Sequence, residues 1–438
     1  MTELGFAPVA RKDRIDVLDI LRGIAILGIF YLNIPLMGNS GSLQANDIRS
    51  IGWSGADQIV WSIIDVVGEG TQRGLLEMLF GAGMMVLAAR AMEPDGPVAI
   101  ADLYIRRNLW LLGFGLFDVF VLGWIGDILH SYALAALFLF PFRMLKPRTL
   151  FAIGMIYPIV LGFMSLGEYV SRSELIAKVE AVHAKQAAKQ PLSPENVKTL
   201  AEWQKKLDRL KVDPEEKKDI DAEAKAHAPG TGVIDYLSWE ISIWLKFLSE
   251  YLQILWVLEA FSTMLIGIAL WKWRFIQGGR TATFYLVSMI AAYGFGLTAR
   301  AIGVAEFTTF TPIPKTIWVT TEFARLAVTV GHIALVNLAV KSVAGSHLLA
   351  PFKASGRMAF SLYFMQQIIG LWILFAPFGL GLWGKFSHAG LAAIATAVIA
   401  GQVVFANIWM RFFVAGPLEW LWRSLAYVKW QPFARSQP

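Results

Sequence analysis

Several polar side chains that could take part in chemistry lie inside long apolar stretches of this sequence. An ionisable or strongly polar residue in such a stretch costs a few kcal/mol on membrane-insertion scales, so each is a candidate functional residue. The residues predicted to take part in catalysis are Asn33, Asp127 and His130, and those predicted to bind a substrate are Arg22, Arg73, Arg325, His332, Tyr363 and Gln366.

Asp127 and His130 lie three residues apart at the start of an apolar segment. A carboxylate one helical turn from an imidazole can orient the ring and raise its basicity, which is the arrangement that a general base needs. The pair therefore predicts acid–base chemistry. The structural alternative is that Asp127 only caps the start of a helix, a position that aspartate favours.

Arg22 and Asn33 belong to one apolar stretch, 17–37. At about 100° per residue they lie three turns apart and within roughly 20° of one another, so both can face the same side of a helix bundle. Asp19 is one turn before Arg22 and can pair with it. In the alternative, Asp19 and Arg22 form an ion pair at the membrane boundary, and Asn33 only hydrogen-bonds between helices.

Arg325 and His332 are seven residues apart and share a helix face, and Glu322 lies one turn from Arg325. This trio could bind a substrate. The alternative that we favour is a structural salt bridge with a separate hydrogen-bonded histidine, because charges inside a membrane usually pair with each other.

Other kinds of site are not indicated. The sequence has no cysteine, which excludes disulfides, thiolate metal sites and cysteine nucleophiles. It has no phosphate-binding glycine loop, no zinc-type His-x-x-x-His pair and no Gly-x-Ser-x-Gly elbow. We therefore predict no bound metal and no nucleotide hydrolysis of the soluble type.

The elements that must position these residues are membrane spans. The 438 residues are 56% hydrophobic and 16% charged, with a mean hydropathy of +0.53, which is typical of an all-α polytopic membrane protein. The net charge of +6 comes mainly from Lys and Arg at the ends of apolar segments, where they set orientation, so no nucleic acid partner is expected. About ten transmembrane helices are predicted, at 17–37, 70–90, 109–122, 130–142, 151–166, 252–271, 284–301, 318–340, 358–376 and 391–412.

Basic residues precede the first predicted span, at Arg11, Lys12 and Arg14, and this places the N-terminus in the cytoplasm. Ten spans then return the C-terminus to the same side. The chain divides into an N-terminal membrane half, 1–166, a charged helical extracytoplasmic insert, 167–235, and a C-terminal membrane half, 236–438, which ends in an amphipathic cytoplasmic tail. Within the insert, Ser193-Pro194 and Asp213-Pro214 predict helix starts, because each pairs an N-cap residue with proline at the first helical position.

Short motifs extend over nearly the whole chain outside the insert. They are Leu18-Asp-Ile-Leu-Arg-Gly23 with Asn33, Arg73 with Leu79-Phe-Gly-Ala-Gly83, Arg106-Arg107, Gly126-Asp-Ile-Leu129 with Tyr132-Ala133, Met264 to Ala269, Gly356-Arg-Met-Ala359 with Tyr363 and Gln366, and Gly416-Pro-Leu-Glu-Trp-Leu-Trp-Arg423. With these motifs the chain resembles the bacterial YeiB-like inner-membrane family, number 418 among domains of unknown function. The resemblance implies a multi-pass protein of the bacterial inner membrane.

The first span also resembles that of transmembrane acyltransferases, which take an acyl group from cytoplasmic acyl-CoA and deliver it to a hydroxyl or amine on the far side. This second resemblance implies acyl-CoA as co-substrate, Arg22 on the CoA side and Asn33 near the acceptor. Members of the YeiB-like family often have histidine where Asp118 stands and serine where Glu77 stands. These two departures imply either that the acid–base role has moved to His130 or that the chain performs no such chemistry.

Two functional hypotheses use the same residues. The first is acyl transfer to an extracytoplasmic or lipid-linked acceptor, with Asn33 donating to the developing oxyanion. The second is transport of a small anionic or amphipathic solute. A third, a structural or regulatory membrane protein, requires no central cavity. A tunnel from the inner face that ends near Asn33 would favour transfer, and a closed cavity at mid-membrane would favour transport. A small-molecule substrate and membrane lipid are the expected partners, and the oligomeric state is left open.

Overall fold

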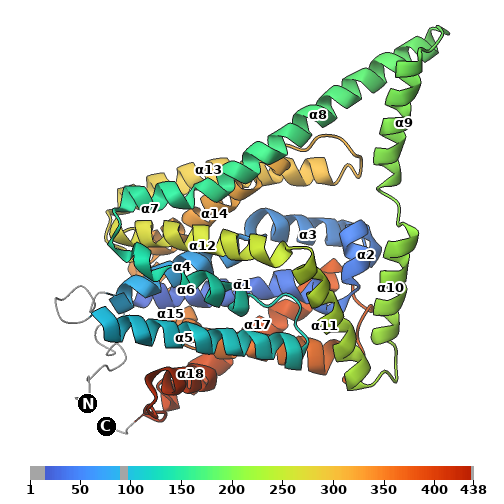
Figure 1. Ribbon diagram of the computed structural model, residues 1–438. Coiled ribbons are helices and arrows are strands. Elements are labelled where there is room, and N and C mark those ends of the chain that lie inside the picture. The colour runs from blue at the N-terminus through green and yellow to red at the C-terminus, as the bar shows by residue number, and fades with distance from the viewer. Residues whose placement is uncertain (1–14, 89–96, 436–438) are drawn as a thin grey trace.

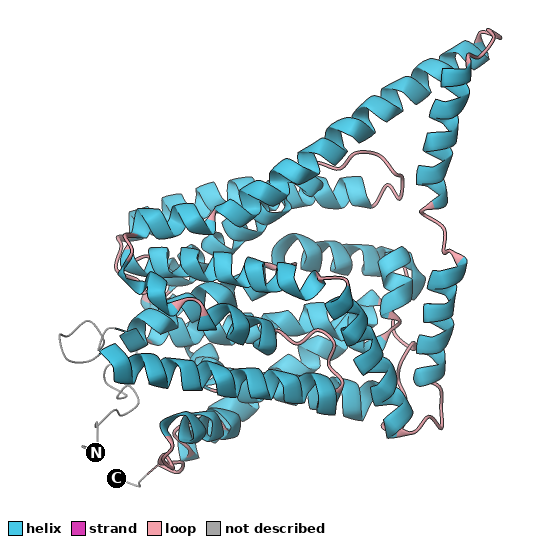
Figure 2. Ribbon diagram, viewed as in Figure 1, coloured by secondary structure: helices cyan, strands magenta, loops and turns pink. Residues whose placement is uncertain are grey.

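The computed structural model describes residues 15–88 and 97–435. Within these ranges the chain is helical apart from turns and a single antiparallel bridge between Phe413 and Ala434, as Figure 2 shows. The all-α prediction is therefore confirmed for the described residues. The helices are α1 (Asp16–Gly38), α2 (Gly41–Asn46), α3 (Gly55–Gly68), α4 (Thr71–Ala88), α5 (Pro97–Phe117), α6 (Leu129–Leu137), α7 (Pro147–Gly154), α8 (Ile156–Ala187), α9 (Pro194–Asp208), α10 (Pro214–Ala226), α11 (Val233–Ser249), α12 (Leu252–Lys272), α13 (Ala282–Phe307), α14 (Ile317–Ala339), α15 (Val343–Arg357), α16 (Ala359–Gln367), α17 (His388–Phe412) and α18 (Pro417–Tyr427).

Six of the described helices are long and apolar enough to cross a membrane. They are α1, α12, α13, α14, α17 and the continuous pair of α7 and α8. A seventh span results if α15 and the segment Ala359–Phe375, which are bent by 73° at Met358, cross together. The chain is thus a multi-span membrane protein, and the count of ten spans stays a prediction.

The segment 130–142, predicted as a spanning helix, is shorter than expected. Its helix α6 ends at Leu137, and a tight 3₁₀ turn with Pro141 near its start follows. Nine residues extend only about 14 Å, roughly half of the hydrocarbon thickness. The α-helical part of this segment therefore cannot cross the membrane alone.

The charged insert begins inside a helix. Figure 1 shows α8 leaving the bundle as a long helix, with α9, α10 and α11 returning along the far end. The two predicted helix starts are confirmed, because the Ser193 and Asp213 side chains accept hydrogen bonds from the amides of Asn196 and Glu216. The division of the chain into three regions stays a prediction.

Helix α1 is the centre of the bundle, in contact with α4, α14, α15, α16 and α17. Its closest approach is to α15, where a Cβ on Gly23 or Gly356 would overlap the opposite backbone at Phe352 and Asp19. Gly81 packs in the same way against the backbone of α12. The small residues at 79–84 thus allow the predicted close helix approach.

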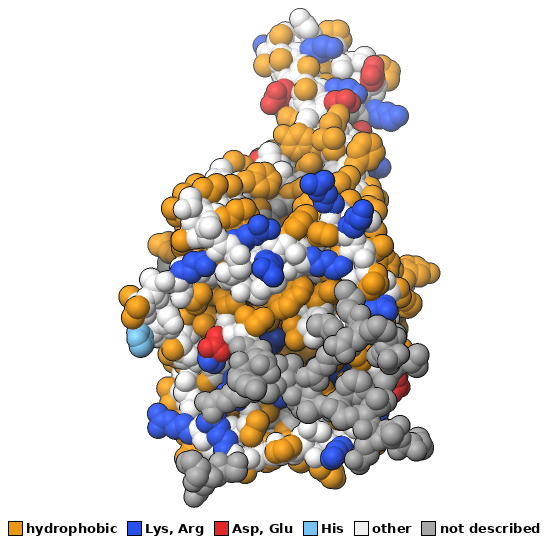
Figure 3. All heavy atoms as spheres, turned by 90° about the vertical axis from the view of Figure 1, so that its left-hand side faces the viewer, with side chains coloured by type: hydrophobic (Ala, Val, Ile, Leu, Met, Phe, Trp, Pro, Cys, Tyr) orange, Lys and Arg blue, Asp and Glu red, His pale blue; other side chains and the backbone are white. Residues whose placement is uncertain are grey.

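One end of the bundle carries a concentration of positive side chains. The connections from α6 to α7 and from α12 to α13 lie at the left of Figure 1. These connections and the helix ends beside them hold Arg143, Lys146, Arg148, Lys272 and Arg274. Figure 3 shows Lys and Arg side chains spread across this face. We call it the basic end.

Candidate functional site

A cavity of about 380 Å³ lies between α1, α4, α5, α6, α15, α16 and α18. Its volume is within the range of about 300–1,000 Å³ that is usual for small-molecule sites. Four arginines line it, so we call it the arginine cavity; they are Arg22, Arg107, Arg357 and Arg423.

The arginine cavity has a surplus of positive charge. Among the described residues its lining carboxylates are Asp19 and Glu419, so the four arginines outnumber the carboxylates by two. Asp19 pairs with Arg22 at 3.0 Å. Glu419 is already committed, because it accepts hydrogen bonds from the amides of Phe360 and Ser361 at the start of α16. The cavity is thus suited to an anionic group.

The remaining wall is apolar and leads to Tyr363. Leu76, Leu79, Phe80 and Leu129 are among its lining residues. The Tyr363 hydroxyl donates to Oδ1 of Asp127 at 3.3 Å. The Asp127 carboxylate therefore lies one side chain behind the cavity wall.

Asp127 and His130 are in direct contact. Oδ2 of Asp127 lies 2.8 Å from Nδ1 of His130 and accepts the His130 backbone amide at 2.9 Å. Nε2 of His130 faces Oε1 of Gln253 at 2.8 Å. His130 is only 3% exposed, so it lies behind the cavity lining and not in it.

The contacts of His130 define what the ring needs in order to act as a base. With an oxygen atom opposite each ring nitrogen, the arrangement as it stands suits an imidazolium. If the Gln253 amide turned over, its NH₂ would donate to Nε2 and the ring could be neutral. The Ser131 hydroxyl also lies 3.2 Å from Nε2. A general-base role thus requires both Gln253 and the Ser131 hydroxyl to turn away from Nε2, which would leave that nitrogen available to a substrate.

The turn that carries Asp127 is held by close packing. A Cβ on Gly115 would lie 2.5 Å from the His130 amide nitrogen, so only glycine lets α5 approach the start of α6 so closely. Gly115 follows Arg107 by about two turns, or about 12 Å, along α5. Arg107 and the Asp127–His130 pair are therefore separated by about 12 Å along the cavity wall.

Asp118 is a residue that the sequence did not single out for a role. It is fully buried in a π-helical turn after α5, beside Asp127, Gln367 and Tyr363, without a well-formed hydrogen bond to any of them. Both amide atoms of Gln367 also lack partners within the described part of the chain. Single π-helical turns often occur at functional sites. The signal in the sequence was an aspartate in an apolar run nine residues before Asp127.

Three predicted site residues lie elsewhere. Asn33 lines neither the arginine cavity nor the second cavity described below, and its Nδ2 has no hydrogen-bond partner among the described residues. Within the described part of the chain, neither of these two cavities forms a tunnel that ends near Asn33. Gln366 donates to the Ile26 carbonyl and to Gln402, joining α1, α16 and α17. His332 contacts the Tyr293 hydroxyl at 2.7 Å and the Val67 carbonyl at 3.2 Å.

Arg73 and Arg325 belong to a buried network of charges and do not line the arginine cavity. Arg325 pairs with Glu322 at 2.9 Å, Glu77 at 3.2 Å and Glu259 at 3.3 Å. Arg73 pairs with Glu259 at 2.8 Å. These contacts join α4, α12 and α14. The contact between Glu322 and Arg325, one helical turn apart, is the salt bridge expected if this pair has a structural role.

Comparison with known proteins identifies the family but no activity. Residues 270–429 match the family described as "Protein of unknown function (DUF418)". The chain is 32% identical to the uncharacterized protein YxaH of Bacillus subtilis (strain 168), with 98% of each chain covered. It is 26% identical to the uncharacterized protein YeiB of Escherichia coli (strain K12), with 94% of this chain and 96% of that protein covered. No solved structure matches. The resemblance noted in the sequence is thus confirmed, and this chain belongs to the DUF418 family of YeiB-like multi-span membrane proteins.

Proposed function

We propose that this protein transfers an acyl group from cytoplasmic acyl-CoA to an extracytoplasmic or lipid-linked acceptor. The observation that carries the proposal is the arginine cavity, whose wall includes guanidinium groups and a tyrosine in contact with the Asp127–His130 pair. An anionic, amphipathic donor fits this combination of charge and apolar surface.

The donor would be held mainly by charge. Arginine forms strong, directional hydrogen bonds to phosphate, and among the described lining residues the four arginines outnumber the two carboxylates. The Arg107 guanidinium is positioned by the Trp422 ring at 4.3 Å. The pantetheine arm and acyl chain would follow the apolar wall towards Tyr363.

The proposed reaction is addition to a thioester followed by loss of the thiolate. The acceptor oxygen or nitrogen forms a bond to the thioester carbonyl carbon while its proton moves to Nε2 of His130. The carbon–sulfur bond then breaks, and the CoA thiolate takes up that proton as it leaves. Asp127 holds Nδ1 of His130 and stabilises the imidazolium, and Asn33 is left out because it does not line the cavity.

The proposed orientation places the basic end and both termini in the cytoplasm, with about ten spans in the bacterial inner membrane. Because the chain has no cysteine, single-cysteine variants can be labelled without background. A cysteine at Arg148, at the basic end, should react with an impermeant maleimide only after cells are opened. A cysteine at Lys205 in α9 should react in intact spheroplasts.

The activity test uses the full-length protein in vesicles supplied with radiolabelled acetyl-CoA and bacterial lipid. Label should appear in an acceptor with wild type, and the rate should fall at least 100-fold in His130→Gln. Arg107→Ala should raise the KM for acetyl-CoA at least 10-fold. The matched control is Arg106→Ala, because the neighbouring Arg106 is outside the cavity lining and pairs with Asp102 at 2.8 Å. Product formation that is equal in wild type and His130→Gln would contradict the proposal.

Transport of a small anionic or amphipathic solute is the second candidate. The buried network of Arg73 and Arg325 with three glutamates favours it, because ion pairs that join three helices could exchange partners when helices move. Transport would give solute uptake into vesicles without any acylated product. The arginine cavity argues against the third hypothesis of a purely structural protein, which has no need of one.

A further inference from the structure

A second cavity, of about 210 Å³, lies between α1, α3 and the start of α17. It shares no lining residue with the arginine cavity. On α1 it begins at Tyr31, nine residues after Arg22, which corresponds to about 14 Å along the helix. This cavity is therefore separate from the proposed donor site. It is larger than an engineered cavity of about 150 Å³ that holds benzene.

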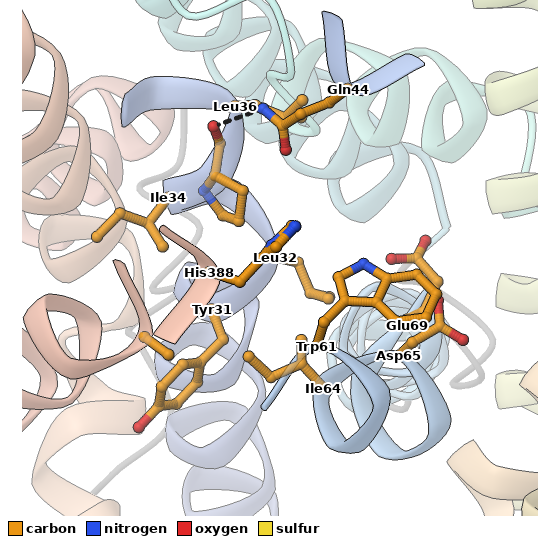
Figure 4. A pocket seen from close by; sticks show the side chains of 12 residues that line it. Tyr31, Leu32, Ile34, Leu36, Gln44, Trp61, Ile64, Asp65, Glu69 and His388 are labelled. Carbon is orange, nitrogen blue, oxygen red and sulfur yellow. Dashed lines mark hydrogen bonds between the residues drawn. The ribbon is translucent and has the colours of Figure 1, made fainter. Parts of the chain in front are cut away.

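The lining combines carboxylates with aromatic and apolar side chains but contains no Lys or Arg. Trp61 and Asp65 are four residues apart, so α3 presents both on one stripe, and Glu69 follows directly after the end of the helix. Figure 4 shows the two carboxylates beside the Trp61 ring, with His388 on the opposite side of that ring. We call this site the acidic aromatic cavity.

His388 supplies an acceptor of a second kind. It is more than nine-tenths buried, and its Nε2 faces the Ile48 carbonyl oxygen at 2.8 Å. Because a carbonyl can only accept, Nε2 must carry the proton, and Nδ1 of the neutral ring is then an acceptor. Nδ1 has no hydrogen-bond partner within the described ranges of the chain. A ligand that donates N–H bonds would satisfy it.

Helix α1 contributes a further acceptor at the same level. Pro35 has no N–H, so the Tyr31 carbonyl oxygen lacks its usual helical donor. Gln44, which also lines the cavity, uses its amide NH₂ on the Pro35 and Ser40 carbonyls and so presents no spare donor. The polar atoms of the lining are therefore mainly acceptors.

The two lining carboxylates and the adjacent Arg300 sum to a single negative charge. Asp65 and Glu69 contribute two negative charges, and Arg300, which donates to the Asp65 backbone carbonyl at 3.1 Å from outside the lining, offsets one. Lys315 is not counted, because the Phe307 ring lies between it and the Trp61 ring of the cavity. One monovalent cation would balance the site.

The carboxylate of Asp65 would gain from such a cation. Burial, with a contribution from Glu69, raises the pKa of Asp65 to about 6. At pH 7 the group is therefore mostly ionised, although no donor side chain hydrogen-bonds it in the described part of the chain. The Trp61 ring offers a cation–π contact beside it.

From this geometry we infer that the acidic aromatic cavity binds a primary ammonium group on a small apolar stem. The N–H donors would bond to Asp65, Glu69 and Nδ1 of His388, and the stem would lie against Trp61 and the aliphatic wall. A primary ammonium fits better than a quaternary one, because the lining acceptors need N–H donors. The site does not depend on the proposed acyl transfer.

The binding test uses the full-length protein in neutral detergent micelles and three probes of similar size. Butylammonium should bind, butyltrimethylammonium should bind at least 5-fold more weakly, and 1-butanol should show no saturable binding by isothermal titration calorimetry. Asp65→Asn should weaken butylammonium binding at least 10-fold. Glu69→Gln, at an exposed position, should weaken it about 3-fold without a risk to folding.

The matched control is Asp47→Asn, because this nearby carboxylate is exposed and already paired with Arg49 at 2.6 Å. It should leave the affinity for butylammonium unchanged. Equal binding of 1-butanol and butylammonium, or unchanged affinity in both Asp65→Asn and Glu69→Gln, would overturn the inference. Unaltered gel-filtration profiles of the variants exclude misfolding as the cause of a loss.

The same chemistry could come from a soluble amine or from the headgroup of phosphatidylethanolamine. The wild-type protein in nanodiscs of phosphatidylethanolamine or phosphatidylcholine distinguishes the two sources. Equal butylammonium affinity in both lipids assigns the site to a soluble amine. Weaker affinity in phosphatidylethanolamine, by competition, assigns it to the lipid headgroup. Absence of binding in both would refute the site.

Discussion

Replacing Arg325 with methionine removes the guanidinium that compensates three buried glutamates. Arg325 lies within 3.3 Å of carboxylate oxygens of Glu77, Glu259 and Glu322, and it also donates to the Thr263 hydroxyl at 3.0 Å. Arg73 alone would then face three carboxylates. Removing one partner of a buried ion pair costs about 3–5 kcal/mol, because the remaining charge is left uncompensated away from water. We expect Arg325→Met to lower the free energy of unfolding by about that amount.

The measurement is an SDS titration of the full-length protein in mixed micelles, followed by circular dichroism. The matched control is Arg106→Met, which breaks an ion pair with Asp102 whose side chains are 36% and 60% exposed. An exposed pair is worth about 0–1 kcal/mol, so this control should change stability little. The triple variant Arg325→Met, Glu77→Gln, Glu322→Gln leaves Arg73 with Glu259 and should recover part of the loss. If Arg325→Met costs no more than the Arg106 control, the network does not stabilise the fold by charge compensation.

Three further predictions concern packing, protonation and the candidate site. Gly356→Ala should lower the free energy of unfolding by about 1–3 kcal/mol, because the added Cβ would overlap the α1 backbone. The control Gly113→Ala should not destabilise the protein, because no atom lies near that position. Equal effects of the two variants in SDS titrations would contradict the packing argument. Burial and the neighbouring Glu223 raise the pKa of Glu240 to about 8. The folded protein therefore keeps a proton on Glu240 that the unfolded chain loses above about pH 4.5. The stability that this proton contributes is fully present below about pH 4.5 and is lost as the pH rises through about 8. Hydrogen exchange of α11 should therefore accelerate from pH 7 to 9, after correction for intrinsic rates, in wild type but not in Glu240→Gln. Tyr363→Phe removes the hydroxyl that donates to the Asp127 carboxylate. This variant should lower kcat for acyl transfer about 10-fold with an unchanged KM for acetyl-CoA. A change in KM alone would assign Tyr363 to donor binding.

The sequence was sufficient for the class of protein and for contacts between near neighbours along the chain. Long apolar segments can be stable only as helices in a membrane, because every backbone N–H and C=O must be paired there. Contacts such as Asp19 with Arg22, Asp127 with His130 and Glu322 with Arg325 span three residues. The pitch of a helix sets the Asp19–Arg22 and Glu322–Arg325 distances, and the turn just before α6 brings Asp127 to His130.

Contacts between helices could not be obtained in this way. Arg22 and Asn33 share a helix face by angle, yet only Arg22 lines the arginine cavity. Two residues on the same face of a helix can be covered by different neighbouring helices, because the neighbours change along the helix axis. Gln253 contacts His130 from 123 positions away in the chain, and no periodicity in the sequence predicts that pairing.

Membrane helices are nearly uniform in hydrophobicity, so their apolar faces carry little information about which helix packs against which. In this protein the sequence alone determined a helical multi-span class, the family, the helix starts of the insert and the pairing of the aspartate with the histidine. Only the tertiary structure decided that four arginines from α1, α5, α15 and α18 line one cavity, that Arg73 and Arg325 neutralise glutamates, and that α3 and α17 enclose a second, acidic cavity. The physical reason is that these groups meet across helices, where close approach depends on glycine contacts and charge pairing that act only once the bundle is assembled.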